Sequence, residues 1–295
     1  MSAFAQTDFN SDRYERCRPT YPNEFFQILD NYHQGKQRLL VDVGCGPGTA
    51  TIQMAGEWKA FDRIIGTDLS PAMIQTANQL SNTVHDNRLS FYVSSSDDFA
   101  FLGPNYKNQQ TVDMITAAEC AHYFDEKRFQ GAVASNLRSR GTIAIFGYGD
   151  AIFLDYPKTD AIINDVSYGK EKLGSLWDEP GRTIAREMLA KWSFDPKFFT
   201  DIEDFSLQAT TLRSTAASEL PQKPLLIIRE MTVAEYASNI RTWSAYHTWQ
   251  KKFGGSKPEL GNEFIKNVNK VYPELTASTK VRVAYSTYYK FARRI

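Results

Sequence analysis

Glycines and carboxylates at two predicted strand ends are the residues of this sequence most suited to binding a ligand. Val41-Asp42-Val43 leads into Gly44-Cys45-Gly46-Pro47-Gly48, and Asp68 follows Gly48 by 20 positions. Glycines at a strand-to-helix turn let the backbone approach a ligand closely. A carboxylate at the end of the next strand can accept hydrogen bonds from both hydroxyls of a ribose. The spacing therefore predicts a loop that binds a nucleoside-containing ligand.

The charge beside this loop restricts the ligand. A nicotinamide-binding loop reads G-x-G-x-x-G and places a pyrophosphate on a helix N-terminus, whereas this loop reads G-x-G-x-G and follows Asp42. A carboxylate is unfavourable beside a pyrophosphate but suits a ligand with a cationic amino-acid end. We therefore predict that S-adenosylmethionine, with its sulfonium, ammonium, ribose and adenine, is the cofactor. The alternative is a glycine-rich turn that binds no ligand.

Two later segments also follow predicted strands. In Ser95-Ser96-Asp97-Asp98-Phe99, a carboxylate or a backbone group could bond the adenine edge, although the same residues suit a helix N-terminus. His122 lies in the segment Ala118-Glu119-Cys120-Ala121-His122-Tyr123-Phe124. The carboxyl ends of parallel strands face the ligand crevice. His122 could therefore contact the substrate or the methyl donor, or it could be an ordinary buried or exposed histidine.

Alternating strand and helix patterns must position these residues. Runs of branched apolar residues predict strands at 39–43, 63–68, 89–93, 112–117 and 142–146. Helical patterns lie between them, at 23–32 before Gly35, at 49–59, after the cap Ser70-Pro71, and at 128–137. Such alternation predicts a parallel sheet with helices on both faces.

The alternation stops after Tyr148. Residues 150–224 are aromatic-rich and irregular, with a strand expected at 201–211. A helix is expected over 232–249, and Val281, Val283 and Tyr285 alternate in a strand expected at 280–289. The second half should therefore complete the sheet and add elements over its edge.

Composition excludes several classes of protein. The chain has 295 residues, 42% of them hydrophobic, and 34 basic residues balance 34 acidic ones, which argues against a dedicated nucleic-acid binder. No apolar run approaches the ~18 residues that span a bilayer, and residues 1–9 lack the pattern of a signal peptide, so a cytoplasmic protein without membrane association is expected. Cys17, Cys45 and Cys120 have neither metal-ligand nor disulfide spacing, and we expect no metal.

The motifs together resemble the class I methyltransferases that use S-adenosylmethionine, and within them the fungal-type trans-aconitate methyltransferases. The resemblance covers nearly the whole chain. The segments that carry the narrower likeness are Asp8-Phe9-Asn10-Ser11, Arg18-Pro19-Thr20-Tyr21-Pro22, Ser94 to Phe99, Glu119 to His122, Glu179-Pro180-Gly181-Arg182 and Arg241-Thr242-Trp243-Ser244-Ala245-Tyr246-His247. Tyr123 departs from the family, which often carries Trp at this position.

This resemblance implies a fold and a domain organisation. The fold is α/β: a doubly wound, mostly parallel seven-stranded sheet with extra helical elements that cover the active site. We expect a single methyltransferase domain over 1–295. Within it, 1–35 lies on the substrate side, 36–150 binds the cofactor, and 151–295 completes the sheet and covers the substrate.

The implied reaction methylates one carboxylate of a small polycarboxylic acid, such as trans-aconitate, to a monomethyl ester. A carboxylate is ionised at neutral pH, so no general base is needed, but arginines must hold the polyanion. Arg18, Arg182, Arg229 and Arg241 are candidates, and we favour Arg182 and Arg241.

The residues expected at the substrate are His122, Arg182, Arg241, Trp243 and Tyr246. Those expected at the cofactor are Asp42, Gly44, Gly46, Gly48, Asp68, Leu69, Met73, Ser96, Asp97 and Glu119.

Two other functions fit the same residues. One is a methyltransferase for a hydroxyl or amine of another small molecule, in which His122 would be the general base. The other is a non-catalytic protein that binds S-adenosylmethionine. The arginines and aromatic residues of the second half argue against the latter, and no pattern in the sequence indicates an oligomeric state.

Overall fold

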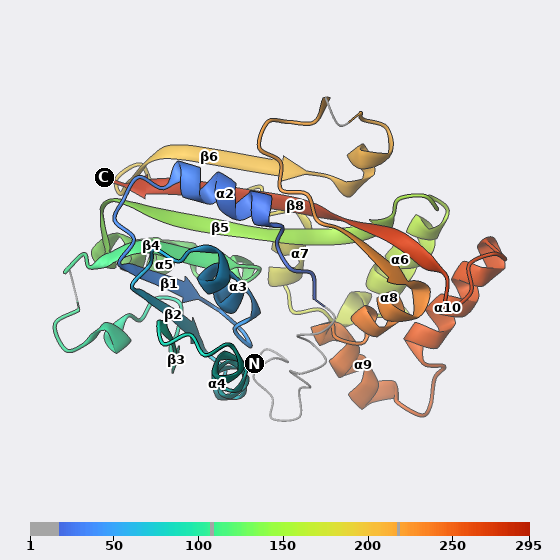
Figure 1. The fold of residues 1–295 in the computed structure, drawn as a ribbon. Helices are drawn as coiled ribbons and strands as arrows, with labels where there is room; N and C mark the ends of the chain where they lie inside the picture. Colours follow the sequence, from blue (N-terminus) through green and yellow to red (C-terminus); the bar gives the residue numbers. More distant parts are fainter. Residues whose placement is uncertain (1–17, 107–108, 217–218) are drawn as a thin grey trace.

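Eight strands join into one sheet in the computed structural model, which describes residues 18–106, 109–216 and 219–295 (Figure 1). The order is β3-β2-β1-β4-β5-β8-β6, and β7 also pairs with β8. The strands are β1 (Leu39–Val43), β2 (Arg63–Asp68), β3 (Leu89–Val93), β4 (Val112–Ala118), β5 (Leu137–Phe153), β6 (Phe199–Leu207), β7 (Ile228–Thr232) and β8 (Lys280–Arg294).

The sheet confirms the predicted mostly parallel architecture. Strands β1 to β5 pair in parallel, and β8 is antiparallel to β5, β6 and β7. The main path contains the seven expected strands, and the short β7 adds an eighth that the sequence analysis did not foresee.

The helices are α2 (Asn23–Tyr32), α3 (Thr49–Glu57), α4 (Pro71–Val84), α5 (Glu126–Asn136), α6 (Thr159–Tyr168), α7 (Gly181–Arg186), α8 (Val233–Ile240), α9 (Ser244–Phe253) and α10 (Leu260–Val271). Side-chain caps mark the starts of the helices α4, α5, α8 and α10 among those of the described chain. The Ser70 side chain accepts a hydrogen bond from the N–H of Met73 at the start of α4. Thr232 and Glu235 form a capping box at the start of α8. Within the described part of the chain, no helix is both long and apolar enough to cross a membrane.

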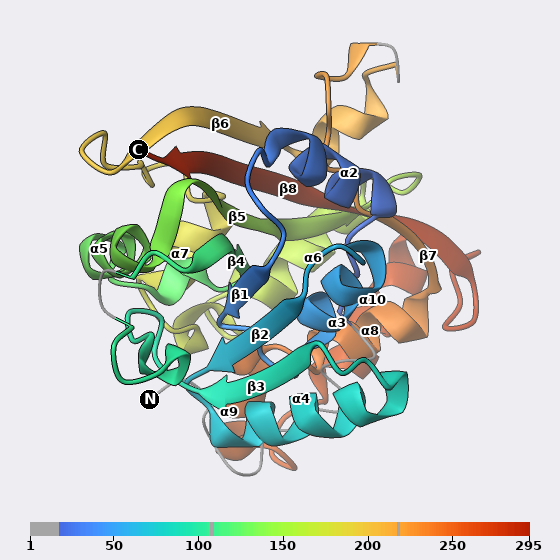
Figure 2. The same cartoon turned by 60° about the vertical axis from the view of Figure 1, so that its left-hand side comes forward.

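Alternation along the strands builds a core on each face of the sheet. In β5, Ala144 and Phe146 belong to one core, while Ile143 and Ile145 belong to the other, as the two-residue period of a strand requires. Helix α2 covers the first face, where the Phe25 ring lies 4.8 Å from that of Phe146 (Figure 2). The sheet thereby holds rigid the strand ends that carry the glycine loop and Asp68.

The second half gathers at the far end of β5. Phe153 at this end pairs with Val283 near the start of β8, and helices α6, α8, α9 and α10 lie around the same end (Figures 1 and 2). Phe153 packs against Tyr236 of α8 and Phe264 of α10. Since β1 to β4 run parallel to β5, their carboxyl ends point toward this helical group.

Two expectations for the second half were wrong. The single helix expected over 232–249 is broken: α8 ends at Ile240 and α9 begins at Ser244. The stretch 150–224, expected to be irregular, contains α6 and α7. The break between α8 and α9 changes which side chains of this segment face the site.

Candidate active site

Three glycines after β1 adopt backbone conformations that favour glycine. The φ angles of Gly44, Gly46 and Gly48 are 66°, 55° and 84°, a region in which side chains are strained. A Cβ atom on Gly44 would lie 2.7 Å from Sγ of Cys120, whereas one on Gly46 would meet nothing within 4 Å. Gly44 therefore allows close packing under the loop, and Gly46 leaves open space above it.

The Asp68 carboxylate ties the end of β2 to this loop. Its Oδ2 accepts a hydrogen bond of 3.0 Å from the Gly46 N–H, and its Oδ1 accepts one of 2.8 Å from the Ser70 N–H. Burial raises its pKa. Asp68 pairs with Val93 of β3, and both Val93 and Leu69 are exposed apolar residues. A carboxylate beside open apolar surface suits a ribose and its attached base.

Met73 and Asp42 occupy supporting positions. Met73 is buried in α4. Asp42 is fully buried: its carboxylate accepts hydrogen bonds from Thr51 Oγ1 at 2.5 Å and Thr116 Oγ1 at 2.7 Å. Burial raises the pKa of Asp42 to about 6. Asp42 thus joins β1 to α3 and β4 beneath the loop, instead of facing a ligand as the sequence suggested.

The segment after β3 is held against α5. Oδ1 of Asp97 accepts a hydrogen bond from Ser95 Oγ at 2.8 Å, and Oδ2 pairs with Arg128 Nη2 at 2.5 Å. The Ser95 hydrogen bond and the Arg128 charge lower the pKa of Asp97. Ser96, which lies between Ser95 and Asp97 in the sequence, is half-buried. The carboxylate of Asp97 is therefore engaged by protein, and its expected contact with adenine stays a prediction.

A cavity, here called the loop cavity, opens beside the glycine loop. Its lining includes Tyr21, Gly44, Gly46, Thr49, Gln53 and Glu119. Gln53 of α3 fixes the wall formed by residues 18–22, because its Oε1 accepts a hydrogen bond of 3.2 Å from the Tyr21 N–H and its amide donates to the Tyr21 carbonyl. The Thr49 hydroxyl and the Tyr21 hydroxyl are buried without a hydrogen-bond partner among the described residues.

Glu119 lies where the loop cavity meets two others. Its φ is 57°, a strained value for glutamate that costs on the order of 1–3 kcal/mol. Two hydrogen bonds to β5 hold it: its N–H donates to the Phe146 carbonyl at 2.9 Å, and its Oε2 accepts from the Tyr148 N–H at 2.7 Å. Burial raises its pKa to about 7, although Arg18 and Arg182 oppose this rise.

The two neighbouring cavities extend from Glu119 and Arg18 toward the added helices. The aromatic cavity is lined by Asp150, Trp177, Arg182, Tyr236, Asn239 and Trp243, among others. The histidine cavity adds His122, Tyr123 and Ser244 to Trp177 and Arg182. Arg18 and Glu119 line the loop cavity and both of these cavities.

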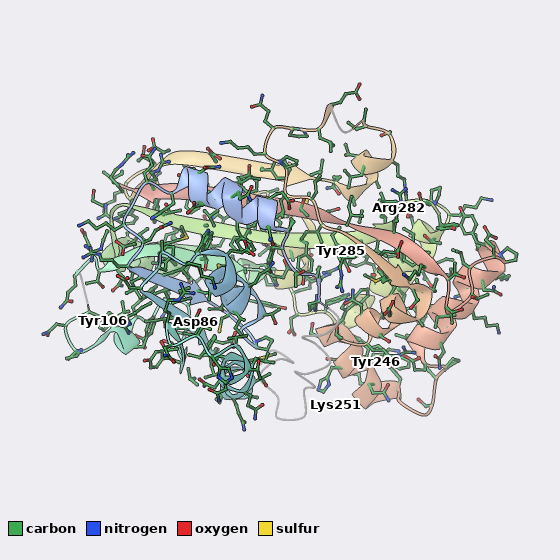
Figure 3. All side chains as sticks on the ribbon, in the orientation of Figure 1. Asp86, Tyr106, Tyr246, Lys251, Arg282 and Tyr285 are labelled. Atoms are coloured by element: carbon green, nitrogen blue, oxygen red, sulfur yellow. The ribbon has the colours of Figure 1, made fainter. Side chains whose placement is uncertain are left out.

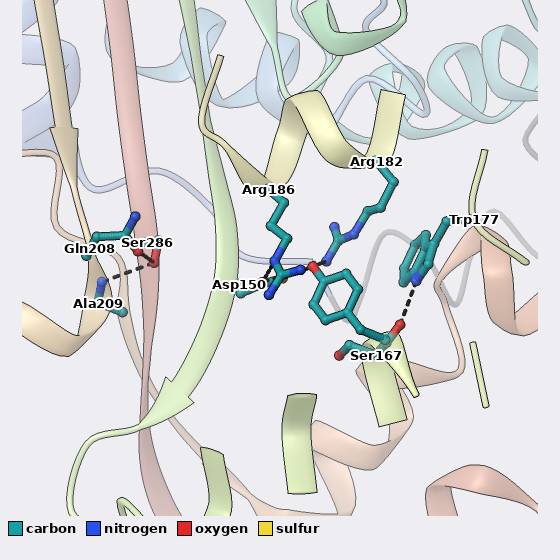
Figure 4. Close-up of polar contacts among 9 residues, drawn as sticks. Asp150, Ser167, Trp177, Arg182, Arg186, Gln208, Ala209 and Ser286 are labelled. Carbon is teal, nitrogen blue, oxygen red and sulfur yellow. Dashed lines mark hydrogen bonds and ion pairs between the residues drawn. The ribbon is translucent and has the colours of Figure 1, made fainter. Parts of the chain in front are cut away.

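Arg182 is held in a polar cluster between α7 and β5. Its Nη2 donates to Asp150 Oδ1 at 2.6 Å and to the Tyr168 hydroxyl. Its guanidinium carbon lies 4.3 Å from the centre of the Trp177 ring. Arg182 and Arg186 both point from α7 toward Asp150 (Figure 4). The structure therefore brings Arg182 into the site, as the sequence suggested.

His122 is buried and neutral. Burial, and then the positive charges of Arg182 and Arg18, lower its pKa to about 3. Its ring centre lies 4.2 Å from that of Tyr123. Its Nδ1 is buried without a hydrogen-bond partner among the described residues. The site thus contains an imidazole that can donate or accept a hydrogen bond but is a weak base.

The structure separates the other three residues expected at the substrate. Trp243 lines the aromatic cavity and packs on Trp177, with ring centres 5.7 Å apart. Arg241 instead donates from Nε and Nη2 to the Glu259 carboxylate, at 3.0 and 2.6 Å, and the Tyr246 hydroxyl donates to the same carboxylate at 2.7 Å. The expectation that Arg241 and Tyr246 face the pocket was therefore wrong. Figure 3 shows Tyr246 among the outer helices, apart from Tyr285 of β8.

Several residues of the site were missed by sequence reasoning. Asp150, Tyr168 and Asn239 carry no local motif; the fold brings Asp150 and Asn239 to the aromatic cavity, and the Tyr168 hydroxyl donates to Asp150. Arg18 was a candidate, and its motif Arg18-Pro19-Thr20-Tyr21-Pro22 was the available signal. Asp8 to Ser11 and Cys17 lie outside the described residues. Across residues 18–106, 109–216 and 219–295, no three His, Cys, Asp or Glu side chains group as a metal site.

The loop cavity fits S-adenosylmethionine. Gly46 leaves room for a ligand; Asp68, which accepts a hydrogen bond from the Gly46 N–H, and the exposed Leu69 lie outside the cavity lining, and they suit a ribose and adenine that extend beyond it. The unpartnered hydroxyls of Thr49 and Tyr21 suit its amino-acid end, since buried polar groups are normally hydrogen-bonded. The Glu119 carboxylate suits a cationic ligand at the boundary of the cavities.

Comparisons with known proteins find methyltransferases among the relatives of this chain. Residues 40–141 match the family model described as "Methyltransferase domain". The chain is 27% identical to the "Probable S-adenosylmethionine-dependent methyltransferase" of Saccharomyces cerevisiae, over 99% of this chain and 98% of that protein. It is 33% identical to a methyltransferase of Aspergillus fumigatus, over 61% of this chain and 54% of that protein.

A solved structure supports the fold. The "Putative Type II Methyltransferase" from Anaeromyxobacter dehalogenans has a TM-score of 0.66 and 22% identity, covering 94% of this chain and 97% of that one. The matched domain, residues 40–141, contains the glycine loop, Asp68 and Glu119. The domain matched at residues 40–141 and these relatives support a methyltransferase that uses S-adenosylmethionine, and the solved structure supports its class I fold.

Proposed function

We propose that the enzyme methylates a carboxylate of a small polycarboxylic acid, such as trans-aconitate, and releases a monomethyl ester. The observation that carries this proposal is that Arg18 and Arg182 both line the cavities that adjoin the loop cavity. Arginine suits a carboxylate because its planar fork of N–H donors matches the two oxygens. Trp177 and Trp243 supply apolar walls around these charges.

The residues of the site bind and orient; they need not remove a proton. S-adenosylmethionine, when bound, supplies an electrophilic methyl group. A substrate carboxylate is already ionised at neutral pH, so the residues of the site would have to hold and orient its oxygen without removing a hydrogen from it. The arginines hold the acid in line, and the half-buried aromatic walls limit the access of water. Because Arg18 lines all three cavities, we expect it to be the arginine nearest the reacting oxygen.

The hydroxyl or amine alternative is less well supported. Such a nucleophile must lose a proton, and His122 would be its base. Because the pKa of His122 is lowered to about 3, the imidazole has little tendency to accept that proton. Glu119 has a pKa raised to about 7, but its carboxylate already accepts the Tyr148 N–H.

A substrate screen tests the proposal. Small mono-, di- and tricarboxylic acids would be incubated with the purified enzyme and S-adenosylmethionine carrying a labelled methyl group. We expect label in a product that dilute base hydrolyses, as an ester requires. Arg182→Gln should lower kcat/KM by about 10- to 100-fold through loss of a charged hydrogen-bond donor. A base-stable product, or labelling only of alcohols and amines, would contradict the proposal.

A further inference from the structure

One edge of the Arg182 guanidinium is already occupied by protein. Its Nη2 donates to Asp150 Oδ1 at 2.6 Å and to the Tyr168 hydroxyl. The Tyr168 hydroxyl in turn donates to Asp150, whose two oxygens lie 2.7 and 2.9 Å away. The indole of Trp177 covers the guanidinium face and is fixed by a hydrogen bond of 2.7 Å from its N–H to the Ser167 carbonyl (Figure 4). Arg182 therefore has one defined orientation.

The Nε of Arg182 has no acceptor within the part of the chain that the structure describes. Its Nε is buried without a hydrogen-bond partner among the described residues, and so is Nδ1 of His122. Both residues line the histidine cavity. A buried hydrogen-bond donor without a partner is unfavourable. Two such nitrogens beside one cavity indicate that a ligand with hydrogen-bond acceptors completes the arrangement.

The chemistry of these nitrogens specifies the ligand. Arginine Nε can only donate, and a neutral imidazole donates from Nδ1 in one of its two tautomers. His122 is neutral because burial and the nearby Arg182 and Arg18 charges lower its pKa. Two N–H donors, one of them cationic, match the two oxygens of one carboxylate.

The position of the histidine cavity distinguishes this carboxylate from the one that reacts. His122 and Arg182 line the histidine cavity but not the loop cavity, whereas Arg18 and Glu119 line both. On the proposed function, S-adenosylmethionine would bind in the loop cavity, so the reacting oxygen would lie near Arg18 and Glu119, which line it. A carboxylate at His122 lies on the far side of that boundary.

We propose that Arg182 Nε and His122 Nδ1 form an anchoring subsite for a carboxylate that is not methylated, and that Asp150 and Tyr168 are positioning residues that orient Arg182 for it. This inference rests on the proposed function and adds to it a reason for selecting acids with more than one carboxylate. The enzyme holds one carboxylate in the histidine cavity and presents another to the methyl group.

A matched pair of substrates tests the subsite. One is a dicarboxylic acid that the wild-type enzyme methylates, and the other is its analogue with the non-reacting carboxylate replaced by methyl. We expect His122→Ala to lower kcat/KM by about 10- to 100-fold for the diacid, through KM, and to change the monoacid little. His122→Asn, whose side-chain N–H lies near the position of Nδ1, should restore much of the diacid activity.

Asp150→Asn should raise the KM of the diacid, whereas Asp155→Asn, which affects the exposed pair with Arg282, should not.

The outcomes separate the subsite from the proposed function. Calorimetry with S-adenosylmethionine first shows that each variant is folded, because its affinity should be unchanged. Equal losses on both acids, or no loss on either, would overturn the subsite while leaving the proposed function intact. A wild-type enzyme that methylates no carboxylic acid would overturn the proposed function and the subsite with it.

Discussion

The backbone N–H of Tyr148 lies 2.7 Å from Oε2 of Glu119 and donates a hydrogen bond to it. Strand β5 thus fixes the carboxylate of Glu119, which directly follows β4. The backbone of Glu119 is left-handed, and the residue lines both the loop cavity and the aromatic cavity. A negative charge at this boundary faces the positive charges of Arg18 and Arg182 and of the cofactor.

Glu119 should make cofactor affinity depend on pH. Burial raises its pKa to about 7, so its carboxylate ionises as pH rises from about 6 to 8. The ionised form attracts a cationic ligand, and the dissociation constant of S-adenosylmethionine should therefore fall over this range and level off above it. Glu119→Gln should bind more weakly at pH 8 and show a flatter profile. Isothermal titration calorimetry across this pH range measures both effects, and an unchanged profile in the variant would assign the dependence to another group.

Asp68→Ala should weaken S-adenosylmethionine binding by about 1.5–3 kcal/mol, because it removes a charged acceptor for buried hydroxyls. It also removes the acceptor for the Gly46 N–H, so the glycine loop should lose order. Calorimetry would measure affinity, and thermal unfolding would report on the loop. Asp62→Ala, at an exposed aspartate before β2, is the control and should bind normally. Equal affinities for S-adenosylmethionine in the two variants would show that Asp68 does not contact the cofactor.

His122→Gln should keep appreciable turnover if the nucleophile is a carboxylate. The pKa of His122 is lowered to about 3, so its titration lies below the range of an activity assay, and no limb of the kcat profile between pH 5 and 9 should disappear in the variant. A general base would contribute about 10²–10⁴-fold. A loss of that size at intact cofactor affinity would favour a hydroxyl or amine substrate.

Arg241→Ala should affect stability and leave catalysis nearly unchanged. Burial alone raises the pKa of Glu259, but hydrogen bonds from Arg241, Tyr246 and two backbone amides outweigh it and lower the pKa to about 2. A lowered carboxyl pKa stabilises the fold above the unfolded value of ~4.5 and loses that contribution as pH falls toward 2.

Urea unfolding measures this contribution. At pH 7 the free energy of unfolding of Arg241→Ala should fall by about 1–2 kcal/mol, since the pair is bidentate and largely covered. The difference from wild type should shrink below pH 4. Arg282→Ala, which removes an exposed pair with Asp155, should cost less than about 1 kcal/mol. A large drop in kcat/KM for Arg241→Ala would contradict this prediction and indicate that Arg241 contacts the substrate.

The first half of the fold could be predicted because its signals are local. Each strand from β1 to β5 contains a short apolar run, and the helices α3, α4 and α5 have Gly48, Ser70 and Asp125 as their N-caps. The second half offered weaker signals. The apolar pattern over 232–249 continues through Trp243, and nothing local shows that the chain turns between Ile240 and Ser244.

The residues of the site also differ in how well the sequence predicts them. The glycine loop, Asp68 and Glu119 follow strand ends, and the parallel sheet brings strand ends together. Arg241 and Arg182 look alike in sequence, and only tertiary contacts distinguish them. Arg241 meets Glu259, the N-terminal cap of α10, while Arg182 meets Asp150 of β5 with its Nε edge left open.

Strand β8 has a consequence for biosynthesis. It is the shared partner of β5, β6 and β7 and pairs, for example, Ile143 with Ala292. Translation makes all three strands before β8, so each emerges from the ribosome with an unpaired edge that no neighbouring segment of the chain covers. Contacts between such distant residues form slowly, and exposed strand edges promote aggregation. During synthesis this protein should therefore depend on chaperones until β8 emerges, and only then can Arg182 and Asp150 assemble beside the glycine loop.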